Sequence, residues 1–318
     1  MRKKILFIGG SVNQTTQMLQ IARHMNAYDC WFSPFYDDGV LGRAARNGFL
    51  DFTIMGNTRA SKALTLLQEH GVGVDYGGMR HDYDLVVTGT DLVVPRNIRK
   101  KNIVLVQEGM TEPETLLYHL ARNISWVPRW VAGTSTTGLS DVYRKFCVAS
   151  YGYRDLFVRK GVREDKIEVT SIPNFDNCER FLDNDFEHRD YVLVCTSDNR
   201  ETFIYENRRR NIQRYLEMAE GRQLIFRLHP NENVRRATGE IRRYAPGSLV
   251  FSDGCTEEMI ANSSMMIAQY SSTILVGSAL GKKVHCSIEP AMLQSLMPLQ
   301  NRRAAENIAT VCSSVLDG

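Results

Sequence analysis

The chain has 318 residues and a mass of 36.2 kDa, which is long enough for two domains of about 150 residues each. Hydrophobic residues make up 43% of it and charged residues 24%, a balance that excludes disordered, collagen-like and low-complexity proteins. The 39 basic and 36 acidic residues leave a net charge of +3, too balanced for a nucleic-acid-binding protein.

The sequence predicts neither a membrane-spanning protein nor a disulfide-rich one. No run reaches the roughly 18 consecutive apolar residues of a transmembrane helix. The first apolar run stops at Gly9, too early for a signal peptide. The seven cysteines are scattered, odd in number and free of C-x-x-C pairs, so neither a disulfide framework nor a zinc site is indicated. We therefore expect the protein in the reducing cytoplasm.

Strands and helices alternate along the first half of the chain. The apolar run at 5–8 predicts a buried strand, and the apolar spacing within 18–25 predicts a helix after it. Further strands are predicted at 85–87, 103–106, 146–149 and 167–169. Ser150 is expected to begin the helix between the last two strands, and Gly161 to end it. Apolar runs of this kind are typical of a parallel sheet buried between helices.

The polar, acidic stretch 174–190 follows Pro173 and interrupts this alternation, so we interpret it as a linker between two domains. A second alternating set then begins. Its strands are predicted at 191–195, 223–228, 248–251, 265–268 and 283–287. Its helices are predicted at 201–220, 234–244, 273–280 and 301–316, with a short additional helix that Thr256 caps.

These elements predict an α/β fold with two Rossmann-like domains that face each other across a cleft. The expected ranges are 1–173 for the first domain, 174–190 for the linker, 191–300 for the second domain and 301–318 for a C-terminal helix. One position open to that helix is against the first domain. Loops at the carboxyl ends of parallel strands line such a cleft, so functional residues are expected directly after strands.

The turn after the first strand is a candidate anion-binding site. Its glycines let a ligand approach the backbone, and the helix start offers free N–H groups. The candidate binding residues are Gly10, Ser11, Asn13, Gln14 and Thr15. The spacing is not that of the dinucleotide fingerprint G-x-G-x-x-G. A tight turn in which Asn13 or Thr15 caps the helix explains the same residues about equally well.

In the second domain, His229 ends a predicted buried strand, with Arg227 before it and Pro230 after it. A histidine in this place can donate a hydrogen bond to a phosphate group. The alternative is a structural histidine. We favour phosphate binding by Arg227, His229 and Pro230, because they lie together at a strand end.

Ser271, Ser272 and Thr273 follow a later strand and begin a helix. Hydroxyl groups, backbone N–H groups and the helix dipole together predict a phosphate-binding turn. The alternative is a simple N-cap, for which Ser272 alone would suffice. Thr196 and Ser197, directly after the first strand of this domain, complete the predicted nucleotide-binding residues.

Glu108 follows a buried strand of the first domain and precedes Gly109. A carboxylate in this place can act as a general base, and burial is expected to raise its pKa. Alternatively, it caps the following helix or pairs with an arginine. Asp37 and Asp38 are the second choice for the base, although they follow Pro34 and could simply form a turn.

On these residues the sequence resembles the GT-B glycosyltransferases. The two-domain plan and the turn at 9–15 carry part of the resemblance. Glu108-Gly109, His229-Pro230 and Ser271-Ser272 resemble the acidic, histidine–proline and serine–serine motifs of bacterial sialyl-, polysialyl- and Kdo-transferases and of polyol-phosphate polymerases. The resemblance implies a cytidine-nucleotide donor, whose phosphate the last two motifs hold. It also implies an acidic group that deprotonates the acceptor.

A second resemblance, over residues 151–177, is to the UDP-N-acetylglucosamine 2-epimerases, in which Glu108 would match an acidic catalytic position. The sequence departs from that family in two places. The stretch 196–201 contains no histidine where the family has a turn rich in histidine and arginine, and Ser271-Ser272 with Leu275-Val276 stand in place of its Gly-Gly and glutamate pair. These departures leave the fold in common and argue against epimerase chemistry.

We therefore expect a glycosyltransferase of surface-polysaccharide synthesis. It would move a sugar from a cytidine or uridine nucleotide-sugar donor to a glycan or lipid-linked acceptor. The alternatives are an enzyme like the epimerases and a nucleotide-sugar-binding protein without catalysis. No cofactor and no metal are expected, because helix dipoles and His229 can supply the positive field that a metal ion supplies elsewhere.

Arginine and lysine gather locally despite the balanced net charge. The clusters lie at 96–101, 208–210, 235–243 and 302–303. They fit two interpretations: solvated helix faces, or attraction to an anionic substrate or lipid. The second interpretation would bring the protein to the inner face of the membrane as a peripheral protein. No nucleic-acid partner is expected.

Overall fold

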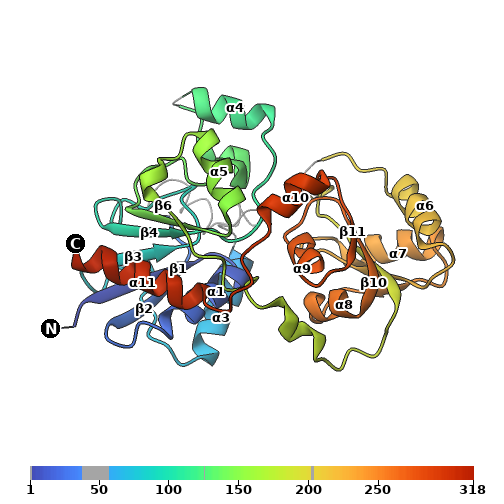
Figure 1. The fold of residues 1–318 in the computed structure, drawn as a ribbon, viewed down its shortest axis with the longest axis horizontal. Helices are drawn as coiled ribbons and strands as arrows, with labels where there is room; N and C mark the ends of the chain where they lie inside the picture. Colours follow the sequence, from blue (N-terminus) through green and yellow to red (C-terminus); the bar gives the residue numbers. More distant parts are fainter. Residues whose placement is uncertain (1, 38–56, 125, 202–203) are drawn as a thin grey trace. The chain divides into compact units, whose positions relative to one another are not determined.

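The computed structural model describes residues 2–37, 57–124, 126–201 and 204–318, and it divides the chain into two compact units. The first unit consists of Met1–Asp176 together with Pro298–Gly318, and the second is Asn177–Met297. Each unit is an α/β structure around one parallel sheet (Figure 1). Within the described residues, no helix is both long and apolar enough to span a membrane.

The first unit contains a six-stranded parallel sheet with the strand order β2-β1-β3-β4-β5-β6. The strands are β1 (Lys4–Gly9), β2 (Asp29–Pro34), β3 (Leu85–Thr88), β4 (Asn102–Val106), β5 (Lys145–Val148) and β6 (Ile167–Val169). Since β1 lies between β2 and β3, the direction of the strand order reverses there. In open parallel sheets, ligands bind outside the carboxyl ends of the strands at such a reversal.

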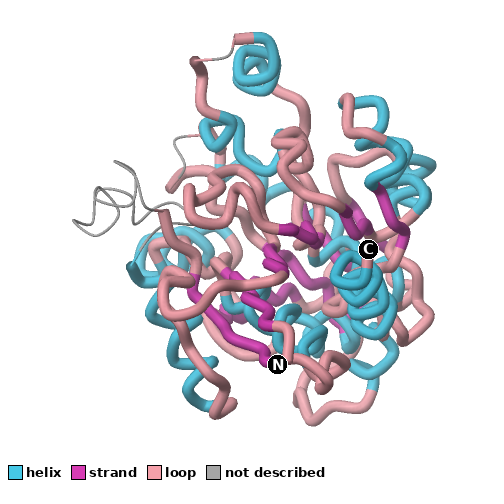
Figure 2. The backbone as a smooth tube through the Cα atoms, turned by 90° about the vertical axis from the view of Figure 1, so that its left-hand side faces the viewer, coloured by secondary structure: helices cyan, strands magenta, loops and turns pink. Residues whose placement is uncertain are grey.

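Helices cover both faces of this sheet (Figure 2). Within the described part of the unit, the α-helices are α1 (Val12–Ala22), α3 (Asn57–Glu69), α4 (Leu116–Asn123), α5 (Tyr151–Lys160) and α11 (Ala304–Asp317). Two short 3₁₀ helices, η1 (Arg129–Thr136) and η2 (Glu164–Lys166), lie between β4 and β6 in the sequence. The expected caps of α5 are confirmed: Ser150 accepts a hydrogen bond from the Tyr153 N–H, and Gly161 ends the helix with φ 103°.

Alternate residues of the strands form two separate apolar layers, because successive side chains of a strand point to opposite faces. On one face, Ile5, Phe7 and Val104 pack with residues of α1 and α11. On the other face, the Phe146 ring lies 4.7 Å from the ring of Phe157 on α5. Helix α11 follows the second unit in the chain and nevertheless packs on β3, β4 and β5.

The second unit contains a five-stranded parallel sheet with the strand order β11-β10-β7-β8-β9. The strands are β7 (Tyr191–Cys195), β8 (Leu224–Arg227), β9 (Leu249–Phe251), β10 (Ser263–Ala268) and β11 (Lys283–His285). The helices are η3 (Cys178–Leu182), α6 (Arg208–Ala219), α7 (Val234–Tyr244), α8 (Thr256–Asn262), α9 (Thr273–Ala279) and α10 (Pro290–Leu296). The strand order reverses between β7 and β10, which again marks a carboxyl edge suited to a ligand.

The prediction of an α/β fold with two Rossmann-like units is confirmed. The unit boundaries are set by local contacts. Residues 177–190 belong to the second unit, where η3 packs on α8 and α9. Residues 298–300 belong to the first unit, because the Leu299 N–H donates to the Ala149 carbonyl and the Leu299 carbonyl accepts from Ser171.

The helix predicted at 201–220 was placed too early. Helix α6 begins at Arg208, and the described residues just before it, 204–207, form a loop. Asn207 is the reason, because its side chain accepts a hydrogen bond from the Arg210 N–H at 3.1 Å and caps the helix.

Candidate functional site

The Glu108 carboxylate lies at the carboxyl edge of the first sheet, directly after β4, and two side chains from the start of α1 donate to it. The Ser11 hydroxyl donates to Oε1 at 3.0 Å, and the Gln14 amide donates to Oε2 at 2.6 Å. Each carboxylate oxygen therefore has its own donor. This arrangement fixes the orientation of the carboxylate and leaves further lone pairs for a substrate hydroxyl.

The start of α1 is itself held in place around this carboxylate. Ser11 caps the helix by accepting a hydrogen bond from the Gln14 N–H at 3.0 Å, and the Gly10 N–H donates to Gln14 Oε1 at 2.6 Å. Gly89, at the end of β3, leaves the room that Gln14 needs, because a Cβ at this glycine would lie 3.0 Å from Gln14 Cγ. Thus β1, β3 and β4 all contribute to the position of Glu108.

The other two candidate residues of this turn serve the protein itself. Thr15 is buried and its hydroxyl donates to the Ser11 carbonyl at 2.8 Å. Asn13 is exposed, and its carbonyl accepts a hydrogen bond from the Asn174 amide at 2.9 Å. The structure therefore brings Gly10, Ser11 and Gln14 to the Glu108 carboxylate, whereas Thr15 points into the packed helix–strand junction.

Asp37 and Asp38 are the second choice for the base. Asp37 comes three residues after β2, whose neighbour in the sheet is β1. Asp38 lies outside the described residues.

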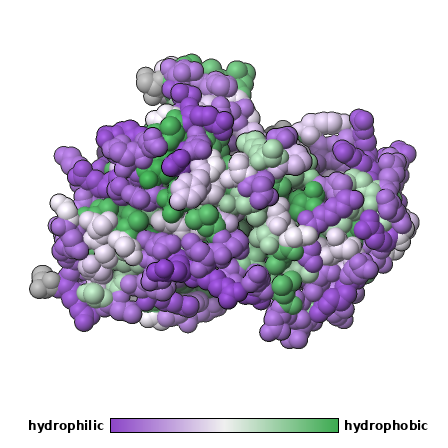
Figure 3. Space-filling view, in the orientation of Figure 1, coloured by the Kyte–Doolittle hydropathy of each residue, from purple (hydrophilic) through white to green (hydrophobic). Residues whose placement is uncertain are grey.

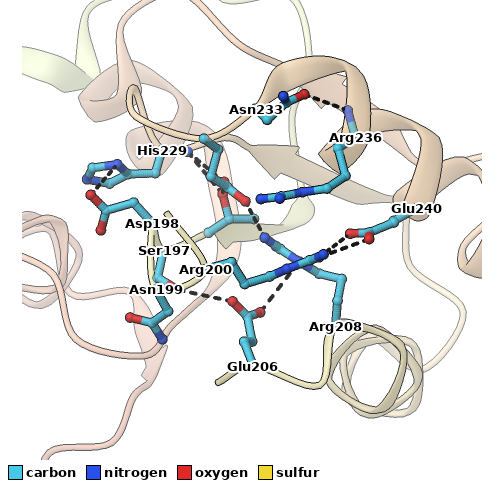
Figure 4. A network of polar contacts seen from close by, with 12 residues as sticks. Ser197, Asp198, Asn199, Arg200, Glu206, Arg208, His229, Asn233, Arg236 and Glu240 are labelled. Carbon is cyan, nitrogen blue, oxygen red and sulfur yellow. Dashed lines mark hydrogen bonds and ion pairs between the residues drawn. The ribbon is translucent and has the colours of Figure 1, made fainter. Parts of the chain in front are cut away.

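In the second unit, polar residues from two loops meet at the carboxyl edge of β7 and β8 (Figure 4). The loop after β7 provides Thr196, Ser197 and Asp198, and the loop after β8 provides His229. The backbone N–H of His229 donates to the Thr196 hydroxyl and to Glu232 Oε2, both at 3.0 Å. These bonds fix the backbone from which the imidazole projects.

The imidazole of His229 is about one-third exposed and lies beside Asp198, with 3.6 Å between Nδ1 and Oδ2. The Asn231 N–H points at the same Nδ1 at 3.2 Å, and the Asn231 side chain donates to Asp198 at 2.7 Å. An Nδ1 that accepts from a backbone N–H leaves the ring proton of the neutral imidazole on Nε2. His229 can therefore donate from Nε2 to a phosphate oxygen.

A buried ionic cluster holds the loop after β8 in place. Glu232 accepts hydrogen bonds from Thr196 and from Arg208, the first residue of α6. Arg208 also lies 3.5 Å from Glu206, and all three charged side chains are almost completely buried. Because buried charges are costly unless they are paired, this cluster couples the loops after β7 and β8 to the start of α6.

Arg227 and Pro230 do not contribute to the hydrogen bonds around the His229 imidazole. The guanidinium of Arg227 binds the Thr256 hydroxyl at 3.0 Å, the Leu228 carbonyl at 3.1 Å and the Gly254 carbonyl at 3.3 Å. It thus ties β8 to the start of α8. Pro230 is exposed beside the imidazole and has no N–H to donate.

The Ser271–Thr273 turn lies after β10, the neighbour of β7 in the sheet. Ser272 occupies the N-cap position of α9 but makes no capping bond with its side chain. Instead, Ser271 Oγ accepts from the Thr273 N–H at 3.3 Å and from the Thr273 hydroxyl at 3.0 Å. Capping therefore uses Ser271, so the simple interpretation that Ser272 caps the helix alone is wrong.

The last residue of β7, Cys195, is a buried cysteine. Burial raises the pKa of the Cys195 thiol to about 12. The thiolate is therefore negligible at neutral pH.

Two adjoining open cavities lie along α7 in the second unit. One has a volume of about 650 Å³ and is lined chiefly by Arg200, Arg208, Arg236 and Glu240. The other, of about 580 Å³, shares Arg236 and Glu240 with it. Most of these arginines are already paired: Arg200 binds Glu240 through both carboxylate oxygens, at 2.9 and 2.7 Å, and Arg236 binds Glu201.

Sequence reasoning missed Asp198, Glu232 and Arg208. Asp198 carries a local signal, since it lies within the loop after a buried strand. Glu232 and Arg208 are 24 positions apart, and their pairing depends on the packing of α6 against the loop after β8. No short motif could have indicated that pair.

Acidic residues at other places do not form an obvious cation site. Among the described residues, no three histidine, cysteine, aspartate or glutamate side chains gather around one point. Asp82 and Asp84, two positions apart, precede β3 at the opposite edge of the sheet from Glu108. Asp82 accepts from the Lys101 ammonium group, and Asp84 accepts from the backbone N–H of Lys4.

Comparison with solved structures identifies the architecture. A variant of the wall teichoic acid polymerase TagF, soaked with CDPG, superposes with a TM-score of 0.58 at 10% identity, over 99% of this chain and 89% of the polymerase chain. The fold is of the GT-B type. The UDP-GlcNAc 2-epimerase of Neisseria meningitidis, bound to UDP-GlcNAc, superposes with a TM-score of 0.60 at 11% identity, over 98% of this chain and 100% of the epimerase.

A further GT-B-like neighbour is the UDP-GlcNAc 2-epimerase of Methanocaldococcus jannaschii, with a TM-score of 0.50 and 11% identity over 98% of this chain and 99% of the epimerase. No protein-family model matches the sequence, and no curated protein matches it. At these identities the likeness concerns the fold, and the resemblance to GT-B enzymes seen in the sequence is confirmed at that level.

Proposed function

We propose that this GT-B protein is a glycosyltransferase, which moves a sugar from a nucleotide-sugar donor to a glycan or lipid-linked acceptor in surface-polysaccharide synthesis. The first unit binds the acceptor and the second binds the donor nucleotide. The reaction takes place on the cytoplasmic side of the membrane, where nucleotide sugars are available.

The Glu108 carboxylate is the observation that carries this proposal. It follows β4 at the carboxyl edge of the first sheet, and the two donors that orient it come from the start of α1, after β1, where the strand order reverses and ligands of open parallel sheets bind. In the proposed reaction, Glu108 takes the proton of the acceptor hydroxyl while the oxygen attacks the anomeric carbon of the donor sugar. The bond from that carbon to the nucleotide phosphate breaks, and the phosphate leaves with the bonding electrons.

In the second unit, His229 is proposed to hold the leaving phosphate. Its Nε2–H is available as the donor because Nδ1 accepts from the Asn231 N–H. Ser271 and Ser272, at the turn after β10, are proposed as further hydroxyl donors. Charge-assisted hydrogen bonds of this kind stabilise the growing negative charge on the leaving group.

The donor base is proposed to be cytosine or uracil. Support comes from the sequence motifs, which resemble those of cytidine-nucleotide users, and from structural neighbours whose crystals contain CDPG or UDP-GlcNAc. Thermal denaturation in the presence of CMP, CDP, UDP or GDP tests this proposal. A ligand at 100 times its dissociation constant stabilises the folded protein by about 2.7 kcal/mol, a readable shift in melting temperature. A protein that responds to none of the four has no donor site.

An epimerase-like enzyme is the second candidate, because two of the structural neighbours are UDP-GlcNAc 2-epimerases. Incubation with UDP-GlcNAc alone distinguishes it from a transferase. Conversion of UDP-GlcNAc without an acceptor indicates an epimerase, whereas release of free nucleotide that requires an acceptor indicates a transferase. Binding without either reaction indicates a nucleotide-sugar-binding protein.

A further inference from the structure

Helix α4 and the segment after it expose large apolar side chains that the fold of the first unit does not use. Leu116 is 76% exposed, Leu117 48% and Leu120 37%. Trp126, three residues beyond the helix, is 81% exposed. We call these four residues the α4 apolar surface. Figure 3 shows hydrophobic side chains on the part of the molecule that α4 forms.

This surface is not the face that attaches α4 to the protein. The helix packs through Tyr118 and Ala121, which are buried against Ala132 of η1 with Val127 and Leu139 around them. Leu116 and Leu120 are four residues apart and Leu117 and Leu120 three apart, so the exposed leucines form a second stripe on the helix. A helix that needed only one apolar face would carry polar residues there.

A lipid bilayer fits this stripe better than a second copy of the chain. The four side chains expose on the order of a few hundred Å² of apolar area, whereas each partner of a stable protein interface buries about 800 Å². Tryptophan and leucine beside an arginine, here the exposed Arg122, are typical of helices that lie in the interface of a bilayer.

The position of α4 in the chain connects this surface to the candidate base. Glu108 and Leu116 are eight residues apart, so the two cannot be separated by more than about 28 Å. A lipid-linked acceptor presents its sugar just outside the headgroups. A bilayer contact at α4 would therefore bring such an acceptor within reach of the unit that carries Glu108.

We propose that the α4 apolar surface inserts into the interface of a lipid bilayer and delivers a lipid-linked acceptor to the first unit. The role in delivery rests on the proposed function, whereas bilayer binding itself does not. Acidic Glu112 and Glu114 and basic Arg122 and Arg129 lie close by in the sequence, so their charges balance. Binding is therefore driven by apolar insertion and depends little on anionic lipid.

Cosedimentation with vesicles tests the proposal. The full chain is mixed with vesicles of phosphatidylcholine alone, or of phosphatidylcholine with about one-third phosphatidylglycerol. The wild-type chain is expected to bind both. A variant with Leu116→Ser, Leu117→Ser, Leu120→Ser and Trp126→Ser is expected to bind at least about tenfold more weakly. Because these side chains are exposed, its circular dichroism and melting temperature should equal those of the wild type.

A matched variant controls for the loss of exposed apolar groups in general. Met79→Ser with Tyr205→Ser removes side chains that are 76% and 87% exposed but lie elsewhere, and it should bind vesicles like the wild type. In a variant that keeps only Trp126 (Trp31→Phe, Trp130→Phe), emission should shift to the blue on vesicle addition. An unshifted emission would place Trp126 in water and contradict the insertion.

Two further outcomes overturn the proposal. One is equal vesicle binding by the wild type and the fourfold variant. The other is a wild-type chain that binds no vesicle but forms a dimer that the fourfold variant does not form, which would make the surface an interface between copies. Transfer to a water-soluble acceptor should be retained by the fourfold variant. Loss of the proposed function and loss of membrane binding can therefore be distinguished.

Discussion

At the scale of single residues, the two candidate groups are held in opposite ways. Glu108 is held through its side chain, because Ser11 and Gln14 each donate to one carboxylate oxygen. His229 is held through its backbone, because Thr196 and Glu232 accept its N–H, and its ring remains partly exposed. A carboxylate with a fixed orientation suits a base that accepts a proton from one defined position. A partly exposed ring on a fixed backbone suits a group that adjusts to a mobile phosphate.

Replacement of Glu108 by glutamine should remove basicity and keep the local structure. Ser11 can accept from the new amide, since a hydroxyl both donates and accepts. We expect the transfer rate to fall by about 10²–10⁴-fold, the usual contribution of a general base, with nucleotide affinity unchanged. Initial rates and a binding isotherm on the same preparation measure this.

The matched control for Glu108→Gln is Glu168→Gln on β6, which also neutralises a carboxylate in the first unit, one that pairs with Lys145 at 2.6 Å. It should leave the rate intact. A folded Glu108→Gln variant with more than about a tenth of normal activity would remove Glu108 from the role of base.

Replacement of His229 by alanine should weaken nucleotide binding by about 10- to 150-fold, because a hydrogen bond to a charged group contributes about 1.5–3 kcal/mol. The transfer rate should fall with it. Calorimetric titration with the nucleotide that wins the thermal screen measures the affinity. His24→Ala, at an exposed position after α1, is the control, and equal affinities in the two variants would contradict the phosphate-binding role.

At the scale of elements, the buried cluster of Glu206, Arg208 and Glu232 joins the loop after β8 to α6. Removing one partner of a buried ion pair leaves the other charge uncompensated, which costs more than a surface pair ever contributes. The loop that carries His229 therefore depends on a charge located in another helix.

We expect Glu232→Gln to lower the free energy of unfolding by about 3 kcal/mol, because Arg208 would keep only the more distant Glu206. Glu240→Gln, which breaks the partly exposed pair with Arg200, should cost no more than about 1 kcal/mol. Urea unfolding followed by circular dichroism compares the two. A larger loss in the Glu240 variant would contradict the assignment of the cluster as the stabilising contact.

The elements that the sequence predicted well are those whose signals are local. Ser150 and Gly161 mark the ends of α5 because capping involves only neighbouring residues. Glu108 and His229 were proposed as site residues because each closely follows an apolar strand. Helix α4 was not predicted, since its eight residues are fewer than the window over which a helical period is recognised. The pairing of Glu232 with Arg208 depends on tertiary packing.

At the scale of the whole molecule, the two units differ in continuity. The second unit is one uninterrupted segment, Asn177–Met297, whereas the first is completed by Pro298–Gly318. Residues Ile308, Ala309 and Cys312 of α11 are buried in the core of the first sheet. The sequence predicted a helix in this region but could not decide where it packs.

The fragment 177–297 should therefore fold alone and bind nucleotide, whereas the fragment 1–176 should not fold. Without α11, the part of one apolar face of the first sheet that lies over β3, β4 and β5 would be open to water, and such a surface favours aggregation. Circular dichroism and sedimentation of both fragments check this. The expectation fails if 1–176 is monomeric and unfolds cooperatively, and adding 298–318 through a short linker should restore folding.

The late position of α11 also affects biosynthesis. Nascent domains are usually completed in the order in which they are translated, at about 5–20 residues per second. Here the strands of the first sheet are made first, but β3, β4 and β5 lack the cover of α11 until the second unit and α11 have been translated, a delay on the order of ten seconds. The second unit can fold during that delay. The first unit, most of which precedes the second unit in the chain, is thus the last to complete its fold. Until then, its open apolar surface is a natural substrate for a ribosome-associated chaperone.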